Sequence, residues 1–504
     1  MKNNFGRISR RRKQNLKERL KNDSTVSCDP VFSAKNIKLE ISEKASAIRC
    51  GGIAAVQTLV NRTGLKRMLD RNLHLLKVHK PYHESDHVLN IAYNIVCGGR
   101  CLEDIELLRN NEIYMDAIGA KRIPDPTTAG DFLRRFEYDD IVALMNAVNC
   151  ANQVIWSVDS DMNSEKDAVL DVDGTITKTF GEKKEKMDMS YKGIWGFDPL
   201  VITEATTGTH LFVVNRPGNE VSHEGAKSWI DRSIELVRNH FRNIYLRGDS
   251  DFSLTGEMDD WDDRGVKFDF AYNASPNLVQ KAESLPKNRW KKFNSVRERA
   301  IKTKARAKKK NVKKSAIEKR KYLNQERVRE YVAEFPYRPG KCKKDYRMIV
   351  VKRVIKVTKG QLRFEDKVKY FFYITNITDM SPGEIVYFNY GRCNHENKIE
   401  QLYNGVRALK MPASEFMANW AYMVICSLAW NFKSWLGQIM PDKEFGQKVI
   451  RMEYRTFLNS IINIPCQIIK SGRAITYRIL NFVPNIEHFF YLFHRIRTLR
   501  IAQT

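Results

Sequence analysis

The sequence of 504 residues predicts an α/β fold in three parts: an all-α N-terminal domain, a sheet covered by helices, and an α+β insertion that interrupts the sheet region. Three observations predict this arrangement. Apolar residues follow helical spacing from 51 to 136, strand and helix patterns alternate from 168 to 273, and a Lys- and Arg-rich stretch separates that alternation from a later helix near 394–409. We expect the functional residues in the alternating part.

The composition indicates a polyanionic partner. Lys and Arg number 86 against 59 Asp and Glu, which gives a formal net charge of +27. A surplus of this size favours nucleic acid as the partner. Aromatic residues make up 11% and hydrophobic residues 42% of the chain, so it is not a charged, disordered tail protein.

The cysteine pattern and the apolar runs predict a cytoplasmic protein without a membrane span. Nine cysteines are scattered without a Cys-x-x-Cys pair, as suits a reducing compartment, and the first 22 residues lack the apolar core of a secretory signal. The one long apolar run, 416–435, contains Asn419, Asn431 and Lys433. We therefore interpret it as a buried helix.

The N-terminal third is expected to consist of a basic tail, 1–45, and a domain of short helices, 46–155. The run 7–21 is rich in Lys and Arg and either contacts phosphates or is a solvated tail. The helical domain suits DNA binding, dimer contacts or both, because no recognition helix stands out. His79, His83 and His87 are spaced by four, but Pro81 argues against one helix through them and hence against a metal site.

Two carboxylates interrupt a short apolar strand at 170–175, which reads Leu-Asp-Val-Asp-Gly-Thr. Asp171 and Asp173 fall on the same face of this strand because side chains alternate. A buried carboxylate costs several kcal/mol unless a cation or hydrogen bonds meet it. A single Asp-Gly pair is more often only a turn, but two further acids change that interpretation.

The further acids are Asp249 and Glu396. Asp249 follows the apolar strand that ends in Arg-Gly, and Glu396 starts a helix whose apolar stripe places it nearer the sheet than Glu400. Acids on a central strand, after its neighbour and at a helix start can hold two divalent cations through oxygen ligands. Such a pair of cations serves phosphodiester chemistry.

The order of elements predicts a ribonuclease H-like domain. Three strands, a helix, a strand, a helix and a strand follow one another in 156–275, with acids after the first and fourth strands. The expected sheet is mixed and five-stranded, and its closing helices lie in 381–440. An α+β insertion, 276–380, separates the two parts, and a C-terminal helical segment occupies 441–504.

The insertion is expected to contact DNA. Between 287 and 329 there are about 19 Lys or Arg against three Glu, in a sequence compatible with helices. A solvated helical hairpin is the alternative, but like charges this dense repel one another unless a phosphate backbone neutralises them. The lysines proposed to contact DNA are Lys308, Lys309, Lys310, Lys313 and Lys314.

Several motifs in the same order resemble the group-one DDE transposases of bacterial insertion sequences, in particular the thirteen-eighty family. The resemblance covers about residues 45 to 440. The motifs are Asp173-Gly-Thr, Arg216-Pro-Gly-Asn219, Arg247-Gly-Asp249-Ser, Arg392-Cys-Asn-His-Glu396-Asn, Cys97-Gly-Gly-Arg-Cys-Leu-Glu-Asp-Ile105, Asp125-Pro-Thr-Thr128 and Phe416-Met-Ala-Asn-Trp420.

The resemblance implies a site of two Mg²⁺ ions, with Mn²⁺ as substitute, held by the catalytic acids Asp173, Asp249 and Glu396. Asp171 is a possible substitute for Asp173, and Asp251 is a weaker rival to Asp249. Related transposases carry Tyr, Arg, Glu and Lys at fixed spacing, and here Asn389 and Tyr403 stand at the Tyr and Lys positions. Tyr390 and Lys398 are the nearest replacements, so the residues expected to meet DNA near the acids are Arg392, Lys398 and Arg247.

The implied function is transposition: binding of terminal inverted repeats, cleavage of DNA at the ends and transfer of the 3′-OH strands into target DNA. The implied partner is double-stranded DNA, bound by a homodimer in the cytoplasm of a prokaryote, at the nucleoid. Two alternatives remain: a ribonuclease H-like nuclease that never joins strands, and a non-catalytic DNA-binding protein derived from a transposase.

Overall fold

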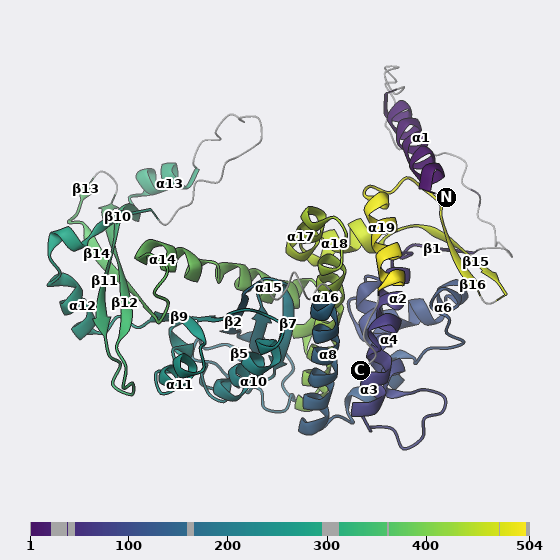
Figure 1. Ribbon diagram of the computed structural model, residues 1–504, viewed down its shortest axis with the longest axis horizontal. Coiled ribbons are helices and arrows are strands. Elements are labelled where there is room, and N and C mark those ends of the chain that lie inside the picture. Colours follow the sequence, from purple (N-terminus) through teal and green to yellow (C-terminus); the bar gives the residue numbers. More distant parts are fainter. Residues whose placement is uncertain are drawn as a thin grey trace.

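The computed structural model describes residues 2–21, 38, 46–158, 166–294, 312–359, 362–472 and 474–499 (Figure 1). A ten-stranded sheet runs through the centre and left of this view, and helices gather on the right. Its strand order is β10-β11-β12-β14-β9-β8-β2-β6-β7, with β13 paired to β12. The sheet therefore joins the predicted catalytic part and the predicted insertion in one structure.

Five strands form the part of the sheet that the sequence predicted. They are β7 (Thr209–Val214), β6 (Leu200–Glu204), β2 (Ala168–Gly174), β8 (Ile244–Gly248) and β9 (Lys267–Tyr272). β2 pairs antiparallel with β6 and parallel with β8, and β8 pairs parallel with β9. The predicted mixed sheet and its element order are thus confirmed. All residues of β6, β7 and β8 are buried, as expected for apolar runs covered on both faces.

The insertion extends this sheet rather than forming a separate one. β14 (Lys367–Thr375) pairs with β9, and β12 (Tyr346–Lys359), β11 (Leu323–Tyr337) and β10 (Lys291–Phe293) follow outward, with β13 (Leu362–Arg363) at the tip. The prediction of helix up to residue 329 was wrong, because 323–329 belongs to β11. The strands β11, β12 and β13 form a long ribbon. Residues 323–329, at the end of this ribbon next to β13, are largely exposed on both faces, so they lack the apolar alternation that marks a strand.

Helices cover the five-stranded part of the sheet, where β6, β7 and β8 are fully buried. α10 (Ala226–Arg238) packs on β2, β6, β7 and β8, α11 (Met258–Asp263) precedes β9, and α12 (Pro276–Glu283) and α13 (Val312–Arg320) belong to the insertion. α14 (Pro382–Tyr390) and α15 (Cys393–Asn404) return the chain to the five-stranded part. α16 (Phe416–Gln438) packs on β7 and is buried almost throughout, which confirms the predicted buried helix. Within the described residues, none of the helices has the length and apolar character that a membrane span needs.

Over residues 46–158, the N-terminal region is helical except for one short strand. Its helices are α2 (Ile53–Thr63), α3 (Leu65–Asn72), α4 (Glu84–Val96), α5 (Ile105–Arg109), α6 (Glu112–Ile118), α7 (Pro126–Leu133) and α8 (Tyr138–Ser157). β1 (Ala47–Ile48) pairs with β15 (Cys466–Ser471), which pairs with β16 (Ala474–Ile479). The predicted all-α N-terminal domain therefore contributes a strand to a C-terminal sheet.

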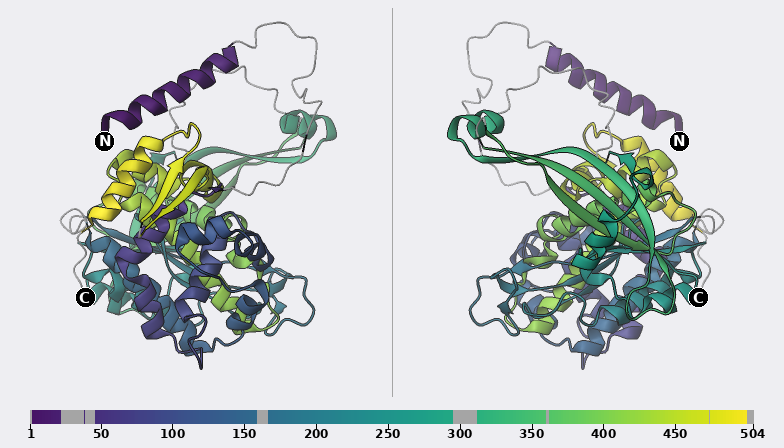
Figure 2. Two further views of the ribbon diagram at one scale, coloured as in Figure 1. Left: turned by 90° about the vertical axis from the view of Figure 1, so that its right-hand side faces the viewer. Right: turned by 90° about the vertical axis from the view of Figure 1, so that its left-hand side faces the viewer.

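The C-terminal segment was predicted to be helical and instead combines helices with that hairpin. Its helices are α17 (Lys443–Arg451), α18 (Tyr454–Phe457) and α19 (Ile486–Thr498), and α19 packs on α2. Figure 2 shows α1 (Lys2–Lys21) standing outside the body beside this C-terminal part. Arg12 Nη1 donates to the carbonyl oxygens of Ile479 and Asn481, at 3.1 and 3.3 Å, so the basic helix contacts the hairpin's end.

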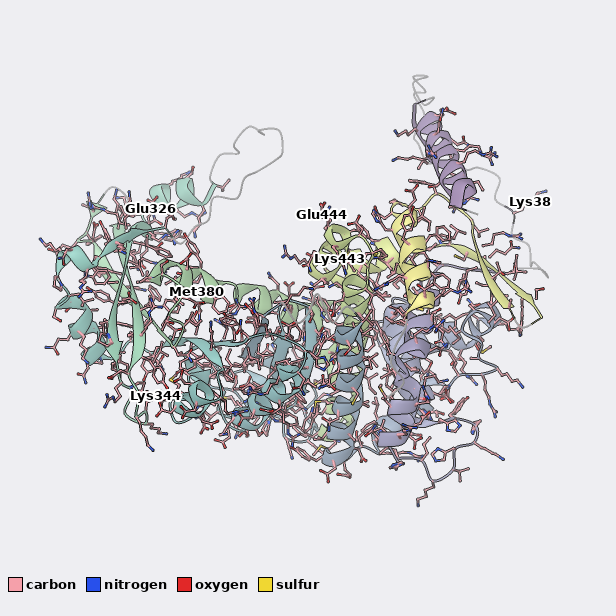
Figure 3. The ribbon with its side chains drawn as sticks, in the orientation of Figure 1. Lys38, Glu326, Lys344, Met380, Lys443 and Glu444 are labelled. Atoms are coloured by element: carbon pink, nitrogen blue, oxygen red, sulfur yellow. The ribbon has the colours of Figure 1, made fainter. Side chains whose placement is uncertain are left out.

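The long ribbon and the C-terminal helices stand on either side of α15. Figure 3 shows Glu326 of β11 at the top of the ribbon and Met380 near the base of α14, with Lys443 and Glu444 of α17 on the other side. Lys344 lies at the opposite end of the ribbon in this view, where its Nζ pairs with Asp262 and Asp263 at 2.5 Å each. This contact ties the base of the ribbon to α11.

Candidate active site

Asp173 and Asp249 meet at one edge of the sheet because they follow neighbouring parallel strands. Asp173 is the last residue but one of β2, and Asp249 comes directly after β8. The carboxyl ends of parallel neighbours lie at the same edge, which is where α/β folds place ligands. Asp249 also caps a short 3-10 helix, Ser250–Phe252, since its side chain accepts a 2.9 Å hydrogen bond from the backbone N–H of Asp251.

Arg392 joins the third acid to the first. Its Nη1 lies 2.9 Å from Asp173 Oδ2 and its Nη2 lies 3.9 Å from Glu396 Oε1. Glu396 is in the first turn of α15 and its side chain is 61% exposed. The apolar stripe predicted for this helix is also seen, because Ile399 and Leu402 are buried. The pair of Arg392 with Asp173 joins the start of α15 to the end of β2.

Burial and neighbouring charges raise the pKa values of Asp173 and Asp249. Burial raises the pKa of Asp173 to about 7, with further increases from the charges of Asp249 and Glu396, while Arg392 opposes the shift. Burial also raises the pKa of Asp249, to which the charge of Asp251 adds, and backbone hydrogen bonds and Arg392 lower it. The charges of Asp249 and Glu396 thus disfavour ionisation of the Asp173 carboxyl, and a cation bound beside Asp173 would favour it.

The residues fit a divalent cation by donor chemistry. Carboxylate oxygens are the ligands that Mg²⁺ and Mn²⁺ prefer, and no cysteine or histidine needs to take part. Among the described residues, no group of three His, Cys, Asp or Glu side chains lies close enough to hold a metal as it stands. Arg392 occupies the space between Asp173 and Glu396, so this side chain has to move before both acids can share a cation.

Asp171 and Arg247 form a buried pair of their own. Arg247 Nε and Nη2 donate to the two oxygens of Asp171 at 2.7 and 3.0 Å, and Nη1 donates to the carbonyl oxygen of Phe388 at 2.7 Å. Asp171 is fully buried and Arg247 is 6% exposed. Asp171 is thus paired with the guanidinium of Arg247. This is the side chain that the sequence analysis proposed for DNA contact.

Comparison with known proteins identifies the family. The model for the transposase DDE domain, group 1, matches residues 31–501. The chain belongs to this transposase family. The resemblance stated from the sequence is therefore confirmed at this level, and membership of the thirteen-eighty branch stays a prediction. No curated protein matches the chain.

Among solved structures, the chain is similar to a piggyBac transposase in a synaptic complex with hairpin DNA, determined by cryo-EM. The identity is 9%, the match covers 82% of this chain and 81% of that chain, and the TM-score is 0.34.

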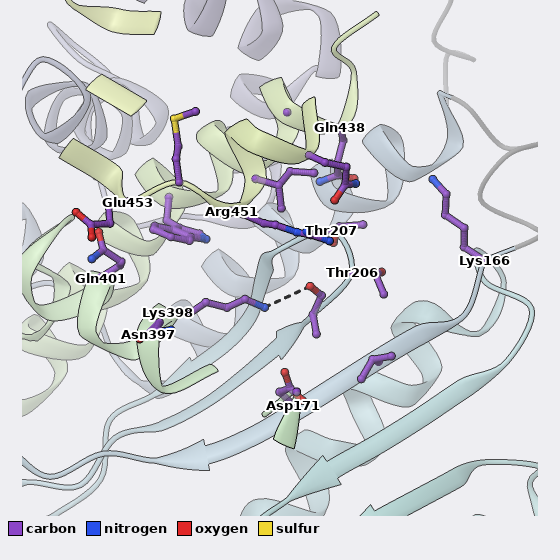
Figure 4. Close-up of a pocket in the computed structure, with 18 of the residues that line it drawn as sticks. Lys166, Asp171, Thr206, Thr207, Asn397, Lys398, Gln401, Gln438, Arg451 and Glu453 are labelled. Carbon is purple, nitrogen blue, oxygen red and sulfur yellow. Dashed lines mark hydrogen bonds between the residues drawn. The ribbon is translucent and has the colours of Figure 1, made fainter. Parts of the chain in front are cut away.

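Lys398 lines a cavity to which Asp171 and Arg247 of this transposase also contribute. The cavity measures about 960 Å³ and lies between the sheet, α15 and α17; its lining includes Asp171, Thr206, Gln401, Gln438 and Arg451 (Figure 4). Lys398 Nζ points into it and donates to the carbonyl oxygen of Ala205 at 3.5 Å. Burial lowers the pKa of Lys398, while the charges of Asp171 and Glu204 oppose this shift. Lys398 therefore faces the cavity rather than Glu396.

Arg216 and Asp198, for which the sequence predicted no role, support the end of β2. Arg216 donates from Nε to the carbonyl oxygen of Asp198 at 2.8 Å and from Nη1 to that of Ser222 at 2.7 Å, and its Nη2 lies 3.5 Å from Asp198 Oδ2. A side chain at Gly174 would come within 3.2 Å of Arg216 and 3.3 Å of Asp198. The pair thus packs against the residue after Asp173, and the Arg-Pro-Gly-Asn motif was the signal that pointed to it.

Two of the five lysines predicted to contact DNA in the insertion are among the residues that the structure describes. Lys308, Lys309 and Lys310 lie outside the described residues, and Lys313 and Lys314 are on α13. Lys313 is exposed. The structure places α13 near the tip of the ribbon, far along the sheet from Asp173 (Figure 1).

Proposed function

We propose that this chain is a transposase that binds the terminal inverted repeats of a bacterial insertion sequence, cleaves DNA at the ends and transfers the 3′-OH strands into target DNA. The five strands β7-β6-β2-β8-β9 with α10 and α15 would be a ribonuclease H-like catalytic domain. The observation that carries the proposal is that Asp173 and Asp249 end neighbouring parallel strands at one edge of this sheet, where Arg392 pairs with Asp173 at 2.9 Å and lies 3.9 Å from Glu396.

The carboxylates of Asp173, Asp249 and Glu396 are the residues proposed to hold two Mg²⁺ ions, for which Mn²⁺ would substitute. Bound there, the ions would supply a water of lowered pKa for attack on the phosphodiester and a positive charge for the departing 3′ oxygen. The raised pKa of Asp173 supports this assignment, because a site whose acids repel one another gains most from a cation.

The protein's own side chains have separate tasks in this proposal. The backbone N–H of Asp251 orients the Asp249 carboxylate. Arg392 neutralises Asp173 and Glu396 before DNA arrives, and its guanidinium would then pair with a DNA phosphate, for which its planar donors are well suited. The Asp171–Arg247 pair would fix β2 against β8 and α14 so that Asp173 and Asp249 keep their spacing.

The DNA path is proposed to run across α15 between the ribbon and the C-terminal helices. Lys313, Lys314 and the neighbouring Lys308, Lys309 and Lys310 would contact phosphates far from the cut, and Lys398 would contact them at the cavity beside α15. Two ends have to be brought together, so a homodimer on DNA is the expected assembly. The expected location is the prokaryotic cytoplasm, at the nucleoid.

The test is cleavage of a labelled duplex that carries the element's own terminal repeat, read from DNA flanking the gene. With Mg²⁺, the wild type should nick at the repeat boundary and then give joined products with added target DNA. Asp249→Ala should bind the repeat and not cut, whereas Asp251→Ala should still cut. Nicking without any joined product would favour a nuclease, and binding without any metal-dependent cut would favour a non-catalytic DNA-binding protein.

A further inference from the structure

Between β2 and β6 the chain leaves the main sheet and forms a small sheet with exposed aromatic side chains. Its strands are β3 (Thr177–Lys178), β5 (Trp195–Phe197) and β4 (Asp188–Met189), in the order β3-β5-β4, and Figure 1 labels β5 beside α10. Trp195 is 50% exposed and Tyr191, in the turn between β4 and β5, is 77% exposed. The other seven tryptophans of the chain are buried or half-buried, so Trp195 is exceptional.

Two of the exposed side chains share one face, and the third lies in the turn beside them. Met189 and Trp195 are cross-strand partners in the antiparallel pair β4–β5, so they project to the same side, and Tyr191 lies in the turn that joins these strands. Met189 is itself 46% exposed. In the β3–β5 pair, Thr177 and Phe197 are cross-strand partners and both are buried. The apolar surface is therefore the outer end of a sheet whose inner end is packed.

This small sheet is fixed to the body of the protein. Lys184 Nζ donates to the carbonyl oxygens of Met411 and Ala413 at 2.5 and 2.6 Å, and Glu185 accepts a 2.9 Å hydrogen bond from the backbone N–H of Phe416. A side chain at Gly218 would come within 2.4 Å of the Gly196 carbonyl, so the turn after Arg216 packs directly on β5. The aromatic side chains are thus held on an ordered support, which lowers the entropy cost of binding a ligand.

The small sheet is next to the candidate active site. The backbone N–H of Thr175, two residues after Asp173, donates to the carbonyl oxygen of Pro199 at 2.9 Å. This hydrogen bond joins the points at which the chain enters and leaves the small sheet. Lys192, beside Tyr191 in the turn, lies close enough for its charge to interact with Asp173 and Asp198. A DNA strand bound at Asp173 would therefore pass this turn.

Lysines alternate with the exposed rings. Lys178 Nζ lies 4.7 Å from the ring centre of Phe180, and Lys192 Nζ lies 5.2 Å from that of Tyr191. Rings with accessible faces stack on nucleobases, and ammonium groups beside them attract phosphates. A paired duplex hides its base faces in its own stack, so rings of this kind gain little from it. Unpaired bases are the ligand that uses both the rings and the lysines.

We propose that Tyr191 and Trp195 form a stacking surface for unpaired bases of the DNA strand held next to Asp173, with Lys178 and Lys192 on its phosphates. The inference rests on the proposed function, because DNA is its ligand. It adds that the protein prefers an end whose terminal bases are already unpaired, or that it opens them when it binds. A platform of two rings predicts about tenfold tighter binding of such an end.

The test compares two labelled DNAs in the absence of divalent metal: a blunt duplex and the same duplex with a single-stranded oligothymidine arm. Wild-type protein should bind the forked DNA about tenfold more tightly. Trp195→Ala and Tyr191→Ala should lose most of this preference and still bind the blunt duplex, and Trp195→Phe should retain it. Tyr491→Ala is the matched control, since Tyr491 is an exposed aromatic residue on α19.

The outcomes separate this inference from the proposed function. Blunt DNA bound and cut by a wild type that shows no preference for the fork would overturn the stacking surface and leave the transposase proposal standing. An undiminished preference in both Trp195→Ala and Tyr191→Ala would also overturn it. Failure to bind either DNA would contradict the proposed function, and the inference with it. Unchanged melting temperatures would show that the variants are folded, as their exposure predicts.

Discussion

Arg247 lies against both carboxylate oxygens of Asp171, at 2.7 and 3.0 Å, and the two side chains are 8% and 1% exposed. Two positions further along β2, Asp173 meets Arg392, whose side chain is 19% exposed. Two acids of one strand are thus each paired with an arginine, and Arg392 is more exposed to solvent than Arg247. This difference separates an acid that supports the fold from an acid available to a ligand.

The first prediction concerns this contrast. Asp171→Ala should destabilise the protein by about 3–5 kcal/mol, because it removes the carboxylate that pairs with the buried Arg247 guanidinium. Asp173→Ala should abolish cleavage without loss of stability, because it removes a carboxylate that burial disfavours. Urea denaturation of both variants measures the difference. A stable Asp171→Ala protein that fails only in cleavage would instead make Asp171 a metal ligand.

The second prediction concerns Arg392, which lies 2.9 Å from Asp173 and 3.9 Å from Glu396, the acids proposed to bind a cation. Without DNA, Arg392→Gln should bind Mn²⁺ about tenfold more tightly than the wild type, because a positive charge has left the site. The same variant should cleave DNA poorly, because the phosphate contact is lost. Calorimetry of Mn²⁺ binding provides the measurement, with Arg455→Gln on α18 as control. Weaker Mn²⁺ binding by Arg392→Gln would show that Arg392 supports the metal site instead of blocking it.

The third prediction concerns pH and His87, which is buried and stacks on Phe132 with ring centres 4.4 Å apart. Burial lowers the pKa of His87 to about 4. The unfolded chain therefore takes up this proton near pH 6.5 and the folded protein only near pH 4, so stability is lost as the pH falls through that window. Over it, wild type should lose about 3 kcal/mol more than His87→Phe in urea denaturation. Parallel losses in the two proteins would contradict the buried neutral histidine.

The fourth prediction concerns salt. If Lys313 and Lys319 of α13 contact phosphates, replacing both by alanine should reduce the slope of log K against log salt by about 1.8, at roughly 0.9 per contact. Lys227→Ala is the control, because this lysine already pairs with Asp231 at 2.6 Å on α10. Filter binding at several salt concentrations gives the slopes. An unchanged slope in the double variant would place the ribbon tip away from DNA.

The sequence predicted the parts of the fold whose local pattern is strong. β6, β7 and β8 are apolar because both of their faces are covered, and α16 is apolar all round for the same reason. Asp173 and Asp249 stood out because a carboxylate at the end of such a strand is unusual. The Asp125-Pro-Thr-Thr128 motif also has a local role that its residue types favour, because the Asp125 side chain caps α7 and accepts a hydrogen bond from the backbone N–H of Thr128.

Other features could not be predicted from local sequence patterns, because they depend on contacts between residues that are far apart in the chain or on very short strands. β1 has two residues and pairs with β15, more than 400 residues later in the chain, so nothing near Ala47 and Ile48 marks them as a strand. β3, β4 and β5 are two or three residues long and lie among lysines. Asp171 and Asp173 share a face in the sequence pattern, and only the position of Arg247 across the β2–β8 pair distinguishes them.

The most direct test of the central claim, that Asp173, Asp249 and Glu396 bind the catalytic metal, is the metal requirement of Asp249→Cys in the cleavage reaction. A thiolate is a poor ligand for Mg²⁺ and a better one for softer ions. The account predicts that this variant does not cut the terminal repeat in Mg²⁺ and regains cutting in Mn²⁺, while Asp249→Ala cuts in neither. Full cutting by Asp249→Cys in Mg²⁺, or cutting by Asp249→Ala in either metal, would contradict a metal-binding role for Asp249.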